Sequence, residues 1–450
     1  MTTEYPDMAR ETPPEAVPSI VETAMRGAEA MRSIPSHERA GILARAAELL
    51  RRNAEEFARL ITGEVAKPIT DARGEVGRGV LTLTACAEEA KRLAGEVVPL
   101  GGAPGGEGKV AWTQREPLGV ILAITPFNFP LNLVLHKAGP ALAAGNAVIV
   151  KPAPAAPRTA ARLSDAMLEA GLPPEAMQIV PGGTETAQAL VKHPDVAMVS
   201  FTGSVRAGRA IQAAAPHKRV TLEMGNAGAA IVAEDADIPR ALDRCFPAAF
   251  AYSGQVCISL QRVYVHTRHI AAFADEFRNR TEALPVGDPF DEATRVSALI
   301  SDEAAGRVEQ WVADAVEQGA KLLCGGTRDG RTLAPTVLLN PSPASSVSCQ
   351  EVFGPVVALY EYDDFEAALD AVNATPFGLQ ASVFTNGLAK AMRAVDRLHM
   401  GTVLINEAPN YRADIMPYGG VKDSGFGREG PRYAIEEMTE PKLVILHTGM

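Results

Sequence analysis

The sequence lacks the features that mark a metal centre, a membrane protein or a secreted protein. Its five cysteines form no Cys-x-x-Cys pair and no Cys/His spacing typical of zinc, so no metal site is predicted. An odd number of cysteines in a chain of 450 residues suits reduced thiols, which favours a cytoplasmic protein. No apolar run reaches the roughly 18 residues that a membrane helix needs. Residues 1–14 are polar and acidic, so no signal peptide is expected.

The chain also lacks an excess of positive charge. It has 43 Lys and Arg against 54 Asp and Glu, a net charge of −11, which argues against nucleic acid or an anionic membrane as a partner. The hydrophobic share of 47% and the charged share of 22% are those of an ordinary globular protein. At 450 residues, two or three domains are expected.

Hydrophobic periodicity divides the chain into a helical first part and two later α/β series. Helices are predicted over residues 20–31, 36–60 and 69–93, followed by a Gly/Pro-rich break and a strand at 110–116. Strands then alternate with helices; the predicted strands are 119–124, 147–150, 177–180, 196–201, 220–223 and 229–232. This rhythm predicts a mostly parallel sheet covered on both faces. A second series spans about residues 238–418, and a terminal strand at 442–447 must pair elsewhere, in this chain or with another subunit.

A thiol and a carboxylate stand at the ends of strand-like segments. Cys257 lies in a small-residue turn ahead of the strand 263–265, and Glu223 ends the strand 219–223. Together they suggest covalent catalysis followed by base-assisted hydrolysis. Each has an ordinary alternative, because free cysteines are mostly small buried hydrophobes and a glutamate at a strand end is usually solvated or paired, here with Arg219.

Three further features could carry chemistry. The turn holding Gly203 and Ser204 lies where a strand gives way to a helix, which suits a phosphate, although such turns often use glycine for geometry alone. Lys151 ends a strand at the edge where open α/β sheets bind ligands, but a solvated lysine is the alternative. Asn128 lies in a proline-framed apolar loop, where its amide either donates to an oxyanion or bonds the turn.

With these residues in place, the chain resembles the NAD(P)-dependent aldehyde dehydrogenase superfamily. Eight motifs carry the resemblance: ITPFNFP (124–130), GNAVIVKP (145–152), FTGS (201–204), LEMGN (222–226), GQVC (254–257), EVFGP (351–355), FGL (377–379) and PYGGVKDSGFG (417–427). The resemblance implies an α/β fold with a Rossmann-type cofactor domain (residues 1–108 and 119–228), an α/β catalytic domain (229–424) and a small β oligomerisation arm (109–118 and 425–450). It also implies a homodimer or homotetramer.

The resemblance further implies oxidation of an aldehyde to a carboxylic acid with NAD or NADP. Cys257 would be the nucleophile, the Asn128 amide and the Cys257 N–H would hold the oxyanion of the thiohemiacetal, and Glu223 would activate the water that hydrolyses the thioester. Lys151 would bind the adenosine ribose, Gly203 and Ser204 the pyrophosphate, and Glu351, beside Phe353, the nicotinamide ribose. The remaining cofactor contacts implied are Thr125, Pro126, Phe127 and Leu222.

The chain departs from the family pattern in two places. Pro154 stands where many NAD-preferring members carry a ribose-binding glutamate, so the choice between NAD and NADP stays open. The usual amino-terminal strand pair is not evident. Two related activities are weighed as rivals: a CoA-acylating semialdehyde dehydrogenase, which typically lacks the carboxylate at Glu223, and a silent dinucleotide-binding relative. A cysteine hydrolase without nucleotide would leave the glycine turn unexplained.

The substrate is suggested by one arginine. The sequences at 222–226, 261–266 and 411–414 resemble the branch that holds lactaldehyde, phosphonoacetaldehyde and related small-aldehyde dehydrogenases. In relatives the segment around Arg412 borders the substrate tunnel. Arg412 could bind an anionic tail, or it could form an internal ion pair with Asp414 or Glu407. The first alternative predicts a short aldehyde with a carboxylate, phosphonate or sulfonate; the natural aldehyde and its pathway stay open.

Overall fold

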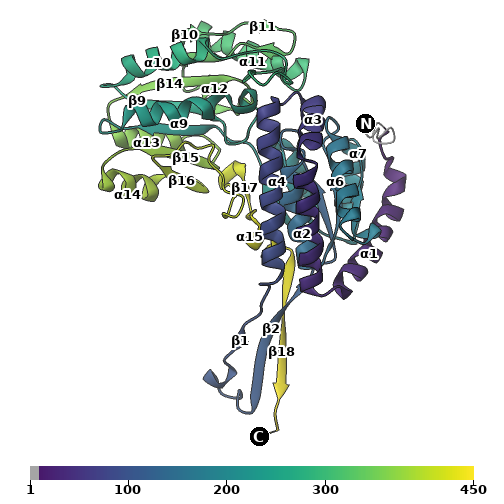
Figure 1. Cartoon of the computed structure of the whole chain (residues 1–450). Helices are drawn as coiled ribbons and strands as arrows, with labels where there is room; N and C mark the ends of the chain where they lie inside the picture. Colours follow the sequence, from purple (N-terminus) through teal and green to yellow (C-terminus); the bar gives the residue numbers. More distant parts are fainter. Residues whose placement is uncertain (1–9, 450) are drawn as a thin grey trace.

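A six-stranded sheet forms one half of the body of the protein. The computed structural model describes residues 10–449, and Figure 1 traces the chain through two α/β bodies and a projecting arm. The strand order is β17-β7-β6-β3-β4-β5, parallel throughout except for β17. The strands are β3 (Val120–Ile124), β4 (Ala147–Lys151), β5 (Met177–Ile179), β6 (Val196–Thr202), β7 (Arg219–Glu223) and β17 (Gly425–Phe426).

Alternation within the central strands explains why helices cover both faces of this sheet. Ile121 and Ala123 of β3 belong to a core shared with helices within residues 36–90, whereas Val120 and Leu122 belong to a core on the other face, which includes Val17 and Val21. Strands buried on both faces read as continuous apolar runs, as β3 and β4 do. The predicted two-sided parallel sheet is therefore confirmed.

A seven-stranded sheet forms the second body, in the order β10-β13-β14-β9-β8-β15-β16. The strands are β8 (Gly228–Val232), β9 (Leu260–His266), β10 (Lys321–Cys324), β13 (Thr336–Leu339), β14 (Val356–Tyr362), β15 (Gln380–Phe384) and β16 (Thr402–Ile405); β11 (Arg328–Asp329) and β12 (Thr332–Leu333) form a separate hairpin. The prediction grouped residues 229–232 with the first series of strands, but β8 pairs with β9 and β15. The chain therefore crosses between the sheets directly after Glu223.

Helices occur in the predicted ranges 20–31 and 69–93, and the structure departs from the prediction in two places. They are α1 (Val17–Ser33), α2 (Ser36–Arg52), α3 (Ala54–Val65), α4 (Ile69–Ala90), α5 (Asn132–Ala144), α6 (Pro157–Glu169), α7 (Thr184–Lys192), α8 (Val205–Ala214), α9 (Ile238–Phe250), α10 (Ile270–Glu282), α11 (Asp302–Glu317), α12 (Ser346–Cys349), α13 (Phe365–Asn373), α14 (Leu388–Arg397) and α15 (Pro431–Glu437). The single helix predicted over 36–60 is wrong, because the chain leaves helical geometry at Asn53 and starts again as α3. Helix α5 was not predicted, since it is buried on all sides and has no polar face to set a period.

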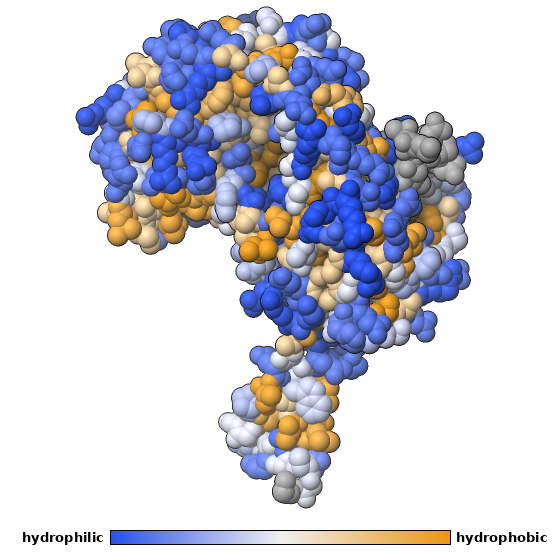
Figure 2. Space-filling model, in the orientation of Figure 1, coloured by the Kyte–Doolittle hydropathy of each residue, from blue (hydrophilic) through white to orange (hydrophobic). Residues whose placement is uncertain are grey.

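The arm is a three-stranded antiparallel sheet of β1 (Val97–Val98), β2 (Lys109–Pro117) and β18 (Thr439–His447). β18 pairs with β2 along its whole length, so the terminal strand finds its partner within its own chain. Figure 1 shows the arm projecting away from both bodies, and Figure 2 shows apolar side chains on its surface. Within residues 10–449 no strand precedes Val97, in agreement with the missing amino-terminal strand pair.

The boundaries of the three domains stay a prediction, and two strands pair outside the domain to which the prediction assigned them. β1 lies in the range assigned to the cofactor domain but pairs in the arm, and β17 lies in the range assigned to the arm but pairs with β7. No helix in the described part of the chain has the length and apolar character needed to cross a bilayer.

A buried carboxylate on α4 fixes the start of α5 and the loop before it. Glu75 accepts hydrogen bonds from the backbone N–H groups of Leu131 and Asn132 and forms an ion pair with Lys67. Both charged side chains are almost completely buried, and the Lys67 ammonium also lies over the rings of Phe129 and Tyr252. A carboxylate suits a helix N-terminus, where backbone N–H groups lack partners.

Replacing this carboxylate should destabilise the protein strongly. Glu75→Gln leaves the Lys67 charge buried without a counter-ion, and we expect the free energy of unfolding to fall by about 3–5 kcal/mol. Guanidinium denaturation at fixed protein concentration measures the change. Glu88→Gln, an exposed position on the same helix, is the control and should shift stability by no more than about 0.5 kcal/mol. Equal stability of the two variants would contradict the assigned role.

Candidate active site

A strained turn presents Cys257. Between α9 and β9 the chain makes a short 3-10 helix, in which Tyr252 and Ser253 adopt left-handed backbone angles, with φ of 45° and 55°. Hydrogen bonds hold the turn, because the Tyr252 hydroxyl donates to Val65 and the Ser253 hydroxyl to Ser297. Such strain persists only where the surroundings over-determine it, and it is common at active sites.

Gly254 in this turn packs against the second motif of the site. A Cβ built on Gly254 would lie 2.0 Å from the carbonyl oxygen of Gly354, so no other residue fits. This contact brings the segment that carries Cys257 against the segment that carries Glu351.

Cys257 lies between two cavities, one of about 440 Å³ and one of about 400 Å³. Among the described residues it is the one that lines both. The thiol is half-buried, and burial raises its pKa to about 11, although a hydrogen bond with Tyr418 and the charge of Arg412 act in the opposite direction. The sulfur is thus open to a ligand from either side.

Glu223 lines the smaller of these cavities together with Cys257. The residue is 2% exposed, and neither carboxylate oxygen has a hydrogen-bond partner among the described residues. Burial, and next the charge of Glu429, raise the pKa of Glu223 well above its usual value. The alternative pairing with Arg219 is wrong, because Arg219 forms its ion pair with Glu440.

Asn128 lines the same cavity from the loop after β3. Its Nδ2 donates to the carbonyl of Gln255 at 2.9 Å, which ties the loop to the segment that carries Cys257. One Nδ2 proton then points elsewhere, since an amide nitrogen carries two. Cys257, Glu223 and Asn128, predicted from separate motifs, therefore meet at one cavity.

The remaining wall of this cavity fits a dinucleotide. Glu351 accepts a hydrogen bond from the Asn226 backbone at 3.0 Å, and burial raises its pKa to about 7. A Cβ on Gly225 would lie 2.7 Å from a Glu351 oxygen, so the glycine leaves room for that carboxylate. Phe353, with a left-handed φ of 53°, packs edge-on against Phe127 at 5.9 Å between ring centroids. Pro126, Gly203 and Ser204 complete the lining.

A third cavity, also of about 400 Å³, is lined by residues of α7 and α8 and by Phe201 of β6. Lys151 and Pro154 line it. Lys151 is buried and donates to the Pro152 carbonyl at 3.2 Å, so the alternative of a solvated lysine is wrong. Burial lowers the pKa of Lys151, and the carboxylate of Glu11 opposes that shift.

The two cavities together contain an ammonium (Lys151), the N-terminus of α8 at Ser204 and a carboxylate (Glu351), which are groups that could hold an extended dinucleotide. Two predicted contacts lie apart from them. The hydroxyl of Thr125 is buried without a described partner, and Leu222 packs in the core; neither lines these cavities. Their contacts with a cofactor stay predictions.

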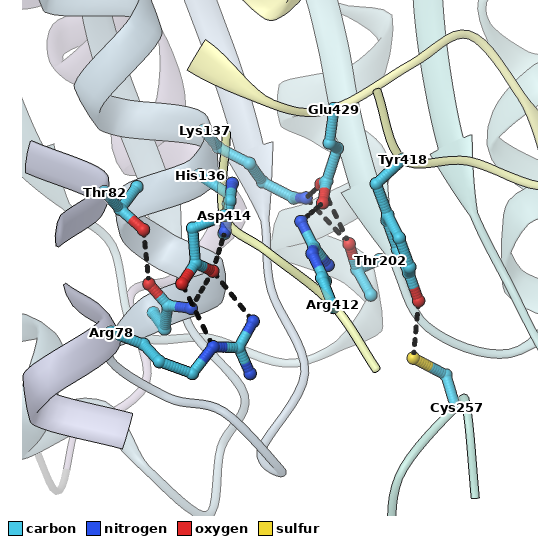
Figure 3. A network of polar contacts seen from close by, with 11 residues as sticks. Arg78, Thr82, His136, Lys137, Thr202, Cys257, Arg412, Asp414, Tyr418 and Glu429 are labelled. Atoms are coloured by element: carbon cyan, nitrogen blue, oxygen red, sulfur yellow. Dashed lines mark hydrogen bonds and ion pairs between the residues drawn. The ribbon is translucent and has the colours of Figure 1, made fainter. Parts of the chain in front are cut away.

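Arg412, which lines the cavity of about 440 Å³, belongs to a buried ionic cluster (Figure 3). Its Nη2 donates to Glu429 at 3.0 Å, so the expected alternatives, Asp414 and Glu407, are wrong as its partners. Lys137 also pairs with Glu429 and donates to Thr202. Although burial raises the pKa of Glu429, Lys137 and Arg412 outweigh it and lower that pKa to about 2.

Asp414 anchors a second cluster, also drawn in Figure 3. It accepts two hydrogen bonds from Arg78, one from Asn132 and one from His136. Burial, followed by the charge of Arg412, lowers the pKa of His136 to about 4, so this imidazole is neutral at pH 7. Glu407 lies 3.6 Å from Arg244 instead.

Sequence reasoning missed most of these partners. Arg78, Lys137 and Glu429 lie far apart in the chain and stand in no spacing that suggests contact. Tyr418 lies inside the PYGG motif, where a buried hydroxyl could have been considered. In the described part of the chain no group of His, Cys, Asp and Glu could hold a metal ion.

Two α/β bodies, with a thiol between a cavity lined by Glu351 and the N-terminus of α8 and a second cavity, are typical of a nucleotide-dependent oxidoreductase that works through a cysteine. The particular family follows from the comparisons. The model of the aldehyde dehydrogenase family matches residues 3–444, and the chain belongs to this family. The predicted family and fold are confirmed.

Three known proteins illustrate the relationship. The chain is 48% identical over 412 residues to a 3-sulfolactaldehyde dehydrogenase of Priestia aryabhattai, covering 91% of this chain and 86% of that protein. The structure of aldehyde dehydrogenase 21 of Physcomitrella patens with the reaction product succinate superposes with a TM-score of 0.95 at 36% identity, covering 97% and 92% of the two chains. The glyceraldehyde-3-phosphate dehydrogenase GapN of Methanocaldococcus jannaschii, complexed with NADP, gives a TM-score of 0.94 at 36% identity, covering 97% and 95%.

Proposed function

We propose that the protein oxidises a short aldehyde with an acidic tail to the carboxylic acid, using NAD or NADP. The observation that carries the proposal is the position of Cys257, which lines both the cavity of Glu223 and Glu351 and the cavity of Arg78 and Arg412. A substrate on one side and a dinucleotide on the other would meet at its sulfur.

In the first half of the proposed reaction the Cys257 thiol loses its proton to solvent, and the thiolate sulfur attacks the carbonyl carbon. A C–S bond forms and the carbonyl electrons move to the oxygen, which the free Nδ2 proton of Asn128 and the backbone N–H of Cys257 hold. When bound, the nicotinamide supplies an acceptor for the hydride of that carbon. Glu351 and Phe353 would orient it. The oxyanion electrons re-form the C=O bond as the hydride leaves, so Cys257 is left as a thioester.

In the second half Glu223 takes a proton from a water molecule. The water oxygen bonds to the acyl carbon, the C–S bond breaks and the sulfur leaves as a thiolate. A carboxylate whose pKa is raised by burial is a better base near neutral pH than an exposed one. Because this carboxylate lines the cavity at Cys257, hydrolysis is favoured over transfer to CoA.

Two variants test these roles in an assay without CoA. Cys257→Ser should abolish nicotinamide reduction. Glu223→Gln should give a burst of one reduced nicotinamide per active site and then a steady state slower by roughly 10²–10⁴-fold, since only thioester hydrolysis is impaired. Rapid-mixing absorbance at the reduced nicotinamide band measures both phases. Undiminished turnover of Cys257→Ser contradicts the proposal, and full wild-type turnover without CoA rules out the acylating rival.

The raised pKa of Glu223 predicts the direction in which the rate of hydrolysis depends on pH. Glu223 acts when ionised, and its pKa is raised, so the wild-type steady-state rate should climb with pH in a window above the usual glutamate range. Glu223→Gln should lack this limb. Steady-state rates across pH, in a buffer series of constant ionic strength, give the comparison; a limb retained in the variant would assign it to another group.

The second cavity supports an anionic substrate. Arg78 uses Nε and Nη2 to bind Asp414, and its Nη1 has no partner among the described residues. The Nε of Arg412 is likewise unpartnered. Lys67 is a third cation of the lining, but it is paired with Glu75, which lines the cavity together with Asp71. Among the relatives, one is named as a dehydrogenase of 3-sulfolactaldehyde, which carries a sulfonate, and another is solved with its reaction product succinate, which carries a second carboxylate.

A matched pair of substrates tests whether the protein binds the acidic tail of the aldehyde. 3-Sulfolactaldehyde and lactaldehyde differ by the sulfonate alone, so the ratio of their kcat/KM values reports its binding. We expect Arg412→Gln to lower this ratio roughly 10- to 100-fold, because a hydrogen bond to a charged group is lost. Arg412→Lys, which keeps the charge, is the control. An unchanged preference in Arg412→Gln rejects the assignment, and Lys137 still pairs with Glu429 in both variants.

We also propose a cytoplasmic homodimer or homotetramer joined through the arm. All five cysteines are free, which suits a reducing compartment. The arm exposes six large apolar side chains, namely Val97, Val110, Trp112, Leu443, Ile445 and Leu446. A group of this kind on a small sheet is typical of a subunit interface.

Sedimentation velocity tests the assembly. The wild type should sediment as a dimer or tetramer, and the double variant Leu443→Asp/Ile445→Asp should shift towards the monomer, because two charges would be buried in the interface. Leu168→Asp, an exposed apolar position on α6, is the control and should leave the assembly intact. A monomeric wild type contradicts this proposal.

A further inference from the structure

The hydroxyl of Tyr418 lies 3.2 Å from the sulfur of Cys257 (Figure 3). Tyr418 is 1% exposed, and among residues 10–449 it is the one side chain hydrogen-bonded to that sulfur. The mechanism proposed above gives this hydroxyl no role.

The position of the hydroxyl is fixed by contacts on both backbone and ring. The backbone N–H of Tyr418 donates to the Glu429 carbonyl at 3.1 Å, and the N–H of Glu429 donates back at 2.7 Å. The guanidinium of Arg412 lies 3.6 Å from the centre of the ring, and Glu429 in turn holds Arg412. A side chain clamped in this way loses little further entropy when it makes a hydrogen bond.

We propose that Tyr418 is a catalytic residue whose hydroxyl donates a hydrogen bond to the sulfur of Cys257 whenever that sulfur carries negative charge. The inference rests on the proposed role of Cys257 as nucleophile.

Negative charge is present on the sulfur at both ends of the reaction. Before attack the reactive species is the thiolate, whose electron pair forms the C–S bond. In hydrolysis the C–S bond breaks and the pair returns to the sulfur. The hydroxyl keeps its own proton in both steps, since burial and the neighbouring Cys257 raise the pKa of Tyr418 well above 10. It is therefore a donor and not a base.

The other charged groups around the sulfur do not replace this donor. Arg412 favours the thiolate, but its guanidinium stacks on the Tyr418 ring and bonds Glu429. Glu223 and Glu351 disfavour the thiolate. Lys67 and Arg78 line the same cavity as Arg412, and each is paired with a carboxylate.

Alkylation of Cys257 by iodoacetamide tests the hydrogen bond without any aldehyde or cofactor. Thiolate attack on the reagent expels iodide, so the rate follows the thiolate fraction. The measurement uses a Cys324→Ser/Cys349→Ser background, because these two thiols are half-exposed, and follows the Cys257 peptide by mass spectrometry across pH. We expect Tyr418→Phe, which keeps the ring over Arg412, to slow alkylation near pH 7 roughly tenfold and to move the profile to higher pH.

Tyr433→Phe is the matched control and should leave the profile unchanged. Circular dichroism melting verifies that each variant is folded. If Tyr418→Phe is alkylated with the wild-type profile, the proposal is overturned. This outcome is separate from failure of the proposed function, which would show as aldehyde oxidation by Cys257→Ser.

Kinetics with two substrates give a second, independent readout. If the hydroxyl acts on the sulfur, Tyr418→Phe should slow the oxidation of 3-sulfolactaldehyde and of lactaldehyde by the same factor of about ten, with their ratio unchanged. If its effect were merely a displaced Arg412, the ratio would fall as in Arg412→Gln, and that result would also overturn the proposal.

Discussion

The candidate site depends on the buried carboxylate of Glu429. Lys137 and Arg412 neutralise it, and its own negative charge helps to raise the pKa of Glu223. Through Arg412 it also sets the ring of Tyr418, whose hydroxyl reaches the sulfur of Cys257. One ionic cluster thus connects the proposed base Glu223, the proposed nucleophile Cys257 and Arg412 of the proposed substrate cavity, although Glu429 itself lines none of the three cavities.

The topology brings these parts together at the crossing between the two sheets. Strand β7 ends the first body at Glu223, and β8 begins the second a few residues later, beside β9, whose preceding turn carries Cys257. The carboxyl edge of a parallel sheet is where open α/β folds bind ligands. Because the chain changes sheets there, the proposed base comes from one body and the proposed nucleophile from the other, and both line the same cavity.

Local sequence was enough to predict the strands of the first sheet and the polar residues at their ends. Continuous apolar runs such as Val120–Ile124 and Ala147–Lys151 can be read without a structure, and so can the glycines at 203 and 254 that mark turns. The partner of Arg412 could not be found in this way. Asp414 and Glu407 are its neighbours in sequence, whereas Glu429 reaches it through a backbone bridge with Tyr418 that no periodicity encodes. Similarly, β8 continued the rhythm of the first series, and only pairing decides which sheet a strand joins.

The cost of the ionic cluster argues that it is kept for chemistry. Removing charges from water is expensive, and a buried ion pair is often no more stable than apolar residues of the same volume. Here two cations and two carboxylates are buried together, and one carboxylate, Glu223, has no hydrogen-bond partner among the described residues. A stable core would pair or replace that group. Leaving it unpaired keeps a proton acceptor of raised pKa in a cavity with an open thiol, which is the condition that the proposed thioester hydrolysis requires.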